Sequence, residues 1–235
     1  IEKLFYKELS AEGFKGEVLL KNGVLTLSEG AFDALNASFD ITGDYNTRDI
    51  DHPLFDIRIK IDELDINKAH DAFVTVQAIA PAAEDTYGIF SLDYAIRGEL
   101  FHNLHPVFET LQGGGTVRIR EARVNGMKVF HHISGITKKE ELMNPELKDL
   151  VMETTVENGM MYVKPFSMKL AGFDTDIEGK HSIDGTLNYV LRMAIPPFDI
   201  VKIPLHVNGT YDNPKIHLGK GHEEAFRKIT MVNVE

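Results

Sequence analysis

The stretch LFDIRIKID at residues 54–62 decides the fold class, because apolar and charged side chains alternate in it from Phe55 to Asp62. The apolar positions are Phe55, Ile57, Ile59 and Ile61, and a charged residue separates each from the next. Successive side chains of a β-strand point to opposite faces of the sheet. This period of two therefore predicts a strand with one apolar face and one charged face.

The same period recurs along the chain and predicts a mostly antiparallel β structure. Alternating apolar residues occupy 116–120, 166–170, 187–193 and 203–207, and the row in 187–193 consists of Leu187, Tyr189, Leu191 and Met193. Asn-Gly dipeptides at 22–23, 158–159 and 208–209 supply the positive φ angles that tight hairpin turns require.

Residues 65–80 break this pattern and predict an amphipathic helix. Apolar side chains recur there at steps of three and four residues, which places them on one face of a helix. Asp65 is the expected N-cap, and Pro81 follows the segment.

Two further helical segments are predicted, at 103–112 and at 137–151. The first ends in three glycines at 113–115, which we interpret as a helix stop and the entry into the next strand. The second begins with the T-x-x-E spacing of a capping box at 137–140. Pro145 is expected to divide it into two short helices.

An internal repeat relates two parts of the chain. Asn22-Gly23 recurs as Asn158-Gly159, and Gly43 recurs as Gly179 at the same offset along the sequence. The repeat covers about 18–62 and 154–194, and repeated units of this kind are typical of an elongated sheet in which neighbours cover one another's apolar face. Chance similarity between two β segments is the alternative.

Length and composition exclude several classes of protein. The chain has 235 residues, with 25 Lys and Arg against 36 Asp and Glu, so 25 − 36 gives a net charge of −11. This balance disfavours nucleic acids and anionic bilayers as partners. The absence of cysteine excludes thiol catalysis, Cys-ligated zinc, iron–sulfur clusters and disulfides.

The sequence contains no apolar stretch near the ~18 residues of a membrane-spanning helix and no visible signal peptide. It begins at Ile1 rather than at a methionine. We therefore expect a fragment or a processed form, whose membrane anchor lies in a segment outside this chain.

The search for catalytic and metal-binding motifs is negative. His102 and His105 have a spacing that would suit one helical face, but Pro106 follows at once and no H-E-x-x-H spacing exists. The glycines at 113–115 lack the Lys-Ser/Thr of a phosphate loop, and Ser134-Gly135 lacks the flanking glycine of a nucleophile elbow. We expect no catalytic residue, no metal ligand and no cofactor, and hence no enzyme.

Five segments together resemble a known family, and their order carries the resemblance. They are LQGGGT at 111–116, NGMMYVKPF at 158–166, DIEG at 176–179, LNY at 187–189 and IPLHVNGTYDNPKI at 203–216. This combination resembles the C-terminal region of AsmA-like proteins of Gram-negative bacteria, and of the Bacteroidota-type members in particular. The similarity spans about residues 15–218, and the GTYDNPKI ending is its most specific piece.

The resemblance implies a periplasmic protein held in the inner membrane by an N-terminal helix. It places the chain among the repeating β-groove, bridge-like lipid carriers, which are implicated in outer-membrane biogenesis and phospholipid homeostasis. The family has no established catalytic residues, so none is carried over. The whole chain, 1–235, is then expected to form a single AsmA-like domain with a phospholipid or another acyl-chain lipid as its partner.

The leading hypothesis is therefore an α+β, mostly β protein: a long antiparallel sheet, curled over an apolar interior, that handles lipids without catalysis. The expected lipid-groove residues are Phe55, Ile57 and Ile59 in the first repeat and Leu187, Tyr189, Leu191 and Met193 in the second. A closed β-sandwich that docks other envelope proteins is the alternative. A third hypothesis, an enzyme acting on glycans or lipids, requires a carboxylate-lined cleft.

Overall fold

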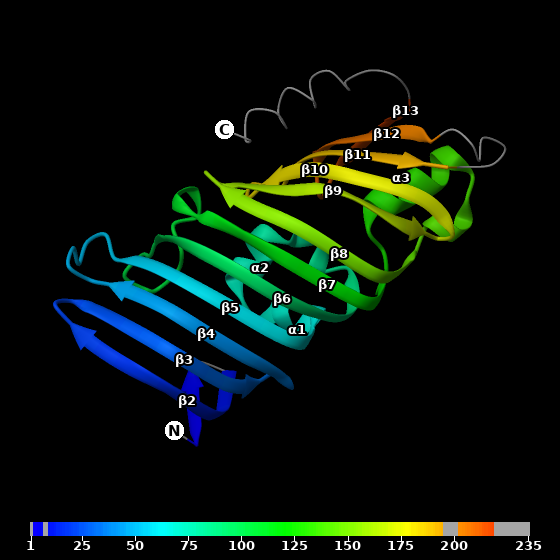
Figure 1. Cartoon of the computed structure of the whole chain (residues 1–235). Helices are drawn as coiled ribbons and strands as arrows, with labels where there is room; N and C mark the ends of the chain where they lie inside the picture. Colours follow the sequence, from blue (N-terminus) through cyan, green and yellow to red (C-terminus); the bar gives the residue numbers. More distant parts are fainter. Residues whose placement is uncertain (1, 7–8, 195–201, 219–235) are drawn as a thin grey trace.

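One antiparallel sheet of 13 strands forms the protein in the computed structural model, which describes residues 2–6, 9–194 and 202–218 (Figure 1). Each strand pairs with its neighbours in the sequence, so the order in the sheet is the order in the chain. The strands are β1 (Lys3–Tyr6), β2 (Leu9–Lys21), β3 (Val24–Ala34), β4 (Ala37–Asn46), β5 (Leu54–Asp65), β6 (Thr86–Glu99), β7 (Gln112–Val124), β8 (Glu146–Glu157), β9 (Met160–Leu170), β10 (Phe173–Ser182), β11 (Thr186–Met193), β12 (Ile203–Thr210) and β13 (Pro214–Leu218). The prediction of a mostly β, curled antiparallel sheet is confirmed.

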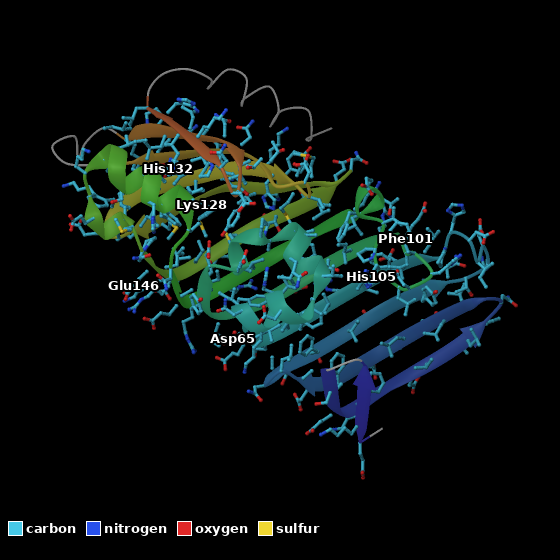
Figure 2. All side chains as sticks on the ribbon, turned by 180° about the vertical axis from the view of Figure 1, so that it is seen from behind. Asp65, Phe101, His105, Lys128, His132 and Glu146 are labelled. Atoms are coloured by element: carbon cyan, nitrogen blue, oxygen red, sulfur yellow. The ribbon has the colours of Figure 1, made fainter. Side chains whose placement is uncertain are left out.

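The helices of the described residues lie on one face of this sheet. They are α1 (Ile66–Ala72), α2 (Val74–Ile79) and α3 (Lys128–Thr137), with single 3₁₀ turns η1 (Pro81–Ala83), η2 (Phe108–Thr110) and η3 (Glu140–Leu142). The α-helices are behind the sheet in Figure 1 and in front of it in Figure 2, which is the view from the other side. We call the side that carries them the helix face and the opposite side the outer face.

The core is the layer between the helices and the helix face. Ala69 of α1 packs with the buried Phe39 and Leu64 of β4 and β5. Ile133 of α3 packs at the other end of the sheet with Leu205 of β12. A sheet with one covered face and one solvated face gives the period of two that the sequence shows.

The segment 65–80, predicted as one helix, is helical but forms two short helices, α1 and α2. Asp65 caps α1, because its Oδ1 accepts a hydrogen bond from the main-chain N–H of Lys68 at 2.9 Å. Phe73 has an extended backbone, with φ −121°, and divides the segment into α1 and α2. Its ring packs beside Ala69 against the strands below, so the break places a large apolar side chain in the core.

The helix predicted at 103–112 is wrong, because only Phe108–Thr110 forms a single 3₁₀ turn. Leu104 adopts a positive φ of 64°. Pro106 lacks an N–H and disfavours the helical conformation of the residue before it. The segment is instead a loop that directs Leu111 into the core, where that side chain is fully buried.

The helices predicted at 137–151 are also wrong. Thr137 ends α3 instead of starting a helix, and its Oγ1 donates to the carbonyl oxygen of Ile133 at 2.8 Å. Lys138 then takes the left-handed conformation (φ 58°) that ends many helices. Pro145 lies before β8 and divides no helix.

The three glycines at 113–115 are part of β7, so the interpretation as a helix stop is wrong as well. Gly115 lies opposite Tyr94 of β6, and a Cβ atom at Gly115 would overlap both the carbonyl oxygen of Asp93 and the ring of Tyr94. The absent side chain leaves room for that ring, whose hydroxyl reaches Thr154 Oγ1 of β8 at 3.0 Å.

The predicted repeat appears as two hairpins with matched bounds. The offset that relates Asn22 to Asn158 also relates both ends of β3 to those of β9, and both ends of β4 to those of β10. The turn residues have nearly equal angles: φ is 51° at Asn22 and 50° at Asn158, and 74° at Gly23 and 72° at Gly159. The two units thus use the same turn geometry.

An irregularity in the pairing is repeated too. The register between β3 and β4 shifts between Leu27 and Gly30, and the register between β9 and β10 shifts between their counterparts, Val163 and Phe166. The offset is lost at the next strand, because residues 47–53 connect β4 to β5 and only residues 183–185 connect β10 to β11. Surface connections tolerate such differences in length.

Candidate functional site

The two predicted rows of lipid-groove residues occupy equivalent positions in the two repeats. Ile57 of β5 lies opposite Gly43, and Tyr189 of β11 lies opposite Gly179, which is the repeat counterpart of Gly43. Both rows face the same side of the sheet as the helices, since Ile57 packs near Ile79 of α2 and Leu191 packs near α3. The two rows differ in how far other elements cover them.

The row in the second repeat is closed core. Leu187 and Leu191 are buried and Met193 has no exposed surface, and all three pack in the cluster that includes Ile133 of α3. Tyr189 is partly buried and packs against the same cluster. The prediction that this row lines an open groove is therefore wrong, because α3 and η3 lie on it.

The row in the first repeat lies at the border of the core. Phe55, Ile57 and Ile59 are each half-buried, and they pack against a buried cluster that includes Tyr94 and Ile96. These residues are covered on one side only, so they connect the closed interior to the surface beyond it.

Beyond that border, the helix face is apolar and uncovered at one end of β2–β5, beside the turn at Asn22-Gly23. Leu20, Leu25, Tyr45 and Phe55 form one cross-strand row, and Val18, Leu27, Gly43 and Ile57 form the next. Val18 is 58% exposed, Leu20 72% and Leu25 38%. We call these eight residues the open strip.

Sequence reasoning missed the β2–β4 part of the open strip. Residues 18–20 read Val-Leu-Leu, and an apolar run without alternation gives no sign of which side chain faces which side. Val18 pairs with Leu27 and Leu20 pairs with Leu25, which places Val18 and Leu20 on the helix face. Leu19 lies between them and therefore faces the outer side.

Two polar contacts hold the covering elements against the sheet. His181 of β10 bonds to the carbonyl oxygen of Ile79, at the end of α2, with Nε2 at 2.8 Å. The hydroxyl of Tyr211, in the turn between β12 and β13, donates to Asp85 Oδ2 at 2.7 Å, and burial raises the pKa of that tyrosine above its usual range. These contacts join parts of the chain 102 and 126 residues apart.

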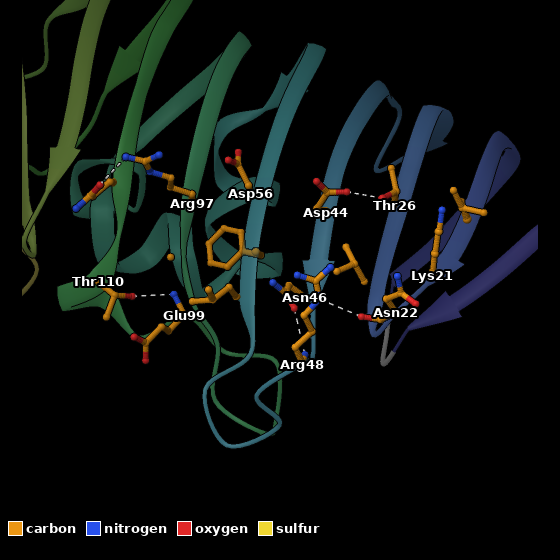
Figure 3. A pocket seen from close by; sticks show the side chains of 16 residues that line it. Lys21, Asn22, Thr26, Asp44, Asn46, Arg48, Asp56, Arg97, Glu99 and Thr110 are labelled. Carbon is orange, nitrogen blue, oxygen red and sulfur yellow. Dashed lines mark hydrogen bonds between the residues drawn. The ribbon is translucent and has the colours of Figure 1, made fainter.

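The outer face carries a polar hollow of about 780 Å³ across β2–β7 (Figure 3). Thr26 donates to Asp44 across β3 and β4, and Arg97 donates to Gln112 across β6 and β7. Arg48 Nε donates to the carbonyl oxygen of Asn22 at 3.0 Å. The side chains of this hollow bond to one another across neighbouring strands, and both signs of charge are present, so its chemistry favours no single class of ligand.

The other residues considered as catalytic or metal-binding candidates lie in surroundings that give them no such site. His102 is exposed in the loop after β6, and the described residues hold no group of three or more His, Cys, Asp or Glu side chains placed to bind a metal ion. The enzyme hypothesis requires carboxylates that line a cleft, but the adjacent Asp62 and Glu63 bond to protein groups: Asp62 accepts a hydrogen bond from Ser91, and Glu63 pairs with Arg120 at 3.3 Å. Ser134 is buried in α3.

No protein-family model, curated protein or solved structure matches this chain. No helix in the part of the chain that the structure describes is long and apolar enough to cross a membrane. The class of protein is therefore defined by its architecture: a single curled sheet with an internal repeat, one apolar face, and the open strip at one end of that face.

Proposed function

We propose that this chain is a non-enzymatic lipid-handling module of a bacterial cell envelope, which binds acyl chains along the open strip. The observation that carries the proposal is the exposure of Val18, Leu20 and Leu25 on a face that elsewhere is packed core. Surfaces of soluble proteins that expose contiguous apolar side chains commonly mark binding sites. Transfer of an acyl chain from water onto such a surface is favourable by about 0.8 kcal/mol per buried CH₂ group.

Exposed apolar side chains in two neighbouring loops extend the apolar surface at this end of the sheet. Ile50 lies between β4 and β5, and Phe101 and Leu104 lie between β6 and β7; all three are exposed. The main-chain N–H of Leu100 donates to the carbonyl oxygen of Pro53 at 2.8 Å, so the two loops are adjacent. They offer a lipid an apolar path to the strip.

The likeness of the sequence to AsmA-like proteins supports a periplasmic location, a phospholipid as the bound molecule, and a role in outer-membrane assembly or phospholipid homeostasis. The alternative of a closed β-sandwich requires a second sheet packed on the first. The described residues form one sheet, and helices cover part of its apolar face.

The test compares two neighbouring leucines of β2. Leu20 is on the helix face and Leu19, 61% exposed, is on the outer face, so L20D and L19D add the same charge at similar exposure on opposite sides of the sheet. Each protein is incubated with phosphatidylethanolamine–phosphatidylglycerol vesicles, recovered without detergent, and examined by native mass spectrometry and lipid extraction.

We expect the unmodified protein and L19D to carry phospholipid, and L20D to lose it. Burial of one leucine side chain is worth about 1.5–3 kcal/mol, which corresponds to a loss of affinity of about tenfold or more. An unmodified protein that stays free of lipid, or equal binding by the two variants, would overturn the proposal.

A further inference from the structure

β2 leaves half of one edge without a strand partner. β1 pairs with β2 from Leu9 to Glu12, and the N–H of Gly13 donates to the carbonyl oxygen of Glu2 at 3.0 Å. Beyond that point, no strand in the described ranges pairs with this edge at residues 15–21, and every residue of the stretch is exposed. An unpaired edge of this length is a template for another strand.

The main-chain groups of Val18 and Leu20 point to this edge. Lys21 and Val24 flank a two-residue turn, and such a pair is joined by main-chain hydrogen bonds. Bonded and non-bonded positions alternate along an antiparallel pair. Val18 and Leu20 therefore direct their N–H and C=O groups away from β3.

We propose that this edge pairs with the same edge of a second copy of the chain, antiparallel about a two-fold axis. Val18 lies opposite Leu20 of the second copy, Leu19 opposite Leu19, and Glu17 opposite Lys21. This register sets Val18 and Leu20, whose main-chain N–H and C=O groups point away from β3, opposite each other, so that they can form hydrogen bonds. It also keeps the side chains of the helix face on the same side of both copies. Such an interface is isologous, as a two-fold axis requires.

Charge selects this register among its neighbours. The pairing of Glu17 with Lys21 occurs twice, once on each side of the axis, and both side chains are on the outer face. A shift by two residues in one direction sets Lys15 opposite Lys21, and the opposite shift sets Glu17 opposite the turn at Gly23. Opposite charges across an antiparallel pair stabilise it, whereas like charges destabilise it.

The dimer joins the open strips of the two copies into one apolar surface. Val18 and Leu20 both belong to the open strip. In the dimer, Val18 of each copy lies beside Leu20 of the other copy. The unpaired part of the β2 edge is also long enough for this pairing. In the proposed register the Asn22-Gly23 turn of the second copy lies opposite residues 15–16, and β1 occupies the edge only as far as Gly13.

Charge exchange at the exposed edge tests the pairing. E17K places lysines opposite Lys21, and K21E places glutamates opposite Glu17, so each single variant should be monomeric. An equimolar mixture of the two, and the double variant E17K/K21E, should regain the dimer. The measurement is sedimentation velocity, in which the dimer has twice the 26.4 kDa mass of the chain, with far-UV circular dichroism to confirm that each variant is folded.

A cross-link tests the register. The chain has no cysteine, so L19C introduces a single thiol on the two-fold axis, at a non-hydrogen-bonded pair whose Cα atoms are about 4.5 Å apart. That spacing suits a disulfide. Under mild oxidation L19C should form a covalent dimer within minutes, whereas V18C, which lies opposite Leu20, should cross-link at least about tenfold more slowly.

Three results would overturn the inference: a monomeric unmodified protein, a dimer that E17K and K21E leave intact, or equal cross-linking of L19C and V18C. None of these results depends on lipid, because the edge is tested by oligomeric mass and by cross-linking, whereas the open strip is tested by the phospholipid that the protein carries. A dimer that persists in both charge variants would identify another surface as the interface.

Discussion

The Nε2 atom of His181 lies 2.8 Å from the carbonyl oxygen of Ile79, and its Nδ1 lies 2.8 Å from the hydroxyl of Tyr189. A carbonyl oxygen only accepts, so Nε2 carries the proton and Nδ1 accepts from the tyrosine. Burial lowers the pKa of His181, and the bond to the carbonyl of Ile79 opposes this in part. Burial also raises the pKa of Tyr189. The pair is therefore neutral, and it holds the end of α2 on β10.

This contact predicts a loss of stability in mild acid. The pKa of His181 in the folded protein is lower than its value of about 6.5 in the unfolded chain, so the unfolded chain binds the proton more readily. The contribution of His181 is complete above pH 6.5 and is lost as the pH falls through that value towards the folded-state pKa. Urea unfolding at pH 7.5 and pH 5.5 should show a smaller free energy of unfolding at the lower pH.

The variant H181Q identifies the source of that dependence. Its amide keeps a donor for the carbonyl of Ile79 but does not titrate, so the free energy of unfolding should depend less on pH than in the unmodified protein. H132Q, at an exposed histidine of α3, is the matched control and should keep the original dependence. Equal pH dependence in all three proteins would show that His181 does not cause it.

Removal of the Tyr94 hydroxyl should destabilise the sheet. Tyr94 and Thr154 are both buried, and their side-chain oxygens lie 3.0 Å apart across β7. Y94F leaves the threonine hydroxyl without this partner, at a cost of about 1–2 kcal/mol in the free energy of unfolding. Y87F, at an exposed tyrosine of the same strand, should change it by less than about 0.5 kcal/mol. A similar effect of both changes in urea titrations would argue against a structural role for the bond.

The two predicted groove rows should respond differently to truncation. Leu191 is 6% exposed within the core cluster of α3, so L191A should cost about 2–5 kcal/mol of unfolding free energy. Ile57 is half-buried, and I57A should cost less, because part of its side chain already contacts water. Urea unfolding of both variants measures the difference. Equal costs would mean that the first row is covered as fully as the second.

Two glycines should respond to alanine with opposite signs. In G115A the new methyl group overlaps the carbonyl oxygen of Asp93 and the ring of Tyr94, so the variant should be destabilised by more than about 2 kcal/mol. Gly135 lies in α3, is exposed, and has no atom near the position of a Cβ. G135A should therefore stabilise the protein by about 0.5–1 kcal/mol, measured as a higher urea midpoint. A stable G115A would show that β6 and β7 can move apart.

Strands and turns were predictable because their signals are local. The alternation in 54–62 and the Asn-Gly turns at 22–23 and 158–159 depend on neighbouring residues only, and they identified the sheet and the repeat. The turn predicted at Asn208-Gly209 is wrong, because both residues lie within β12. The helix α3 was missed because residues 128–137 include two histidines and a Ser-Gly pair, which give weak helical signals. Packing of Ile133 in the core stabilises that helix, and this contact involves residues far away in the sequence.

The sequence by itself determined which side chains of a strand share a face, since a period of two sets one row of Phe55, Ile57 and Ile59 and another of Leu187, Tyr189, Leu191 and Met193. Only the tertiary structure decided which of the two rows is open. The second row is covered by α3, whereas α1, α2 and η2 leave the helix face uncovered at the end of β2–β5 beside the turn at Asn22-Gly23. Burial depends on what packs against a face, and those partners come from distant segments whose positions the local pattern does not encode.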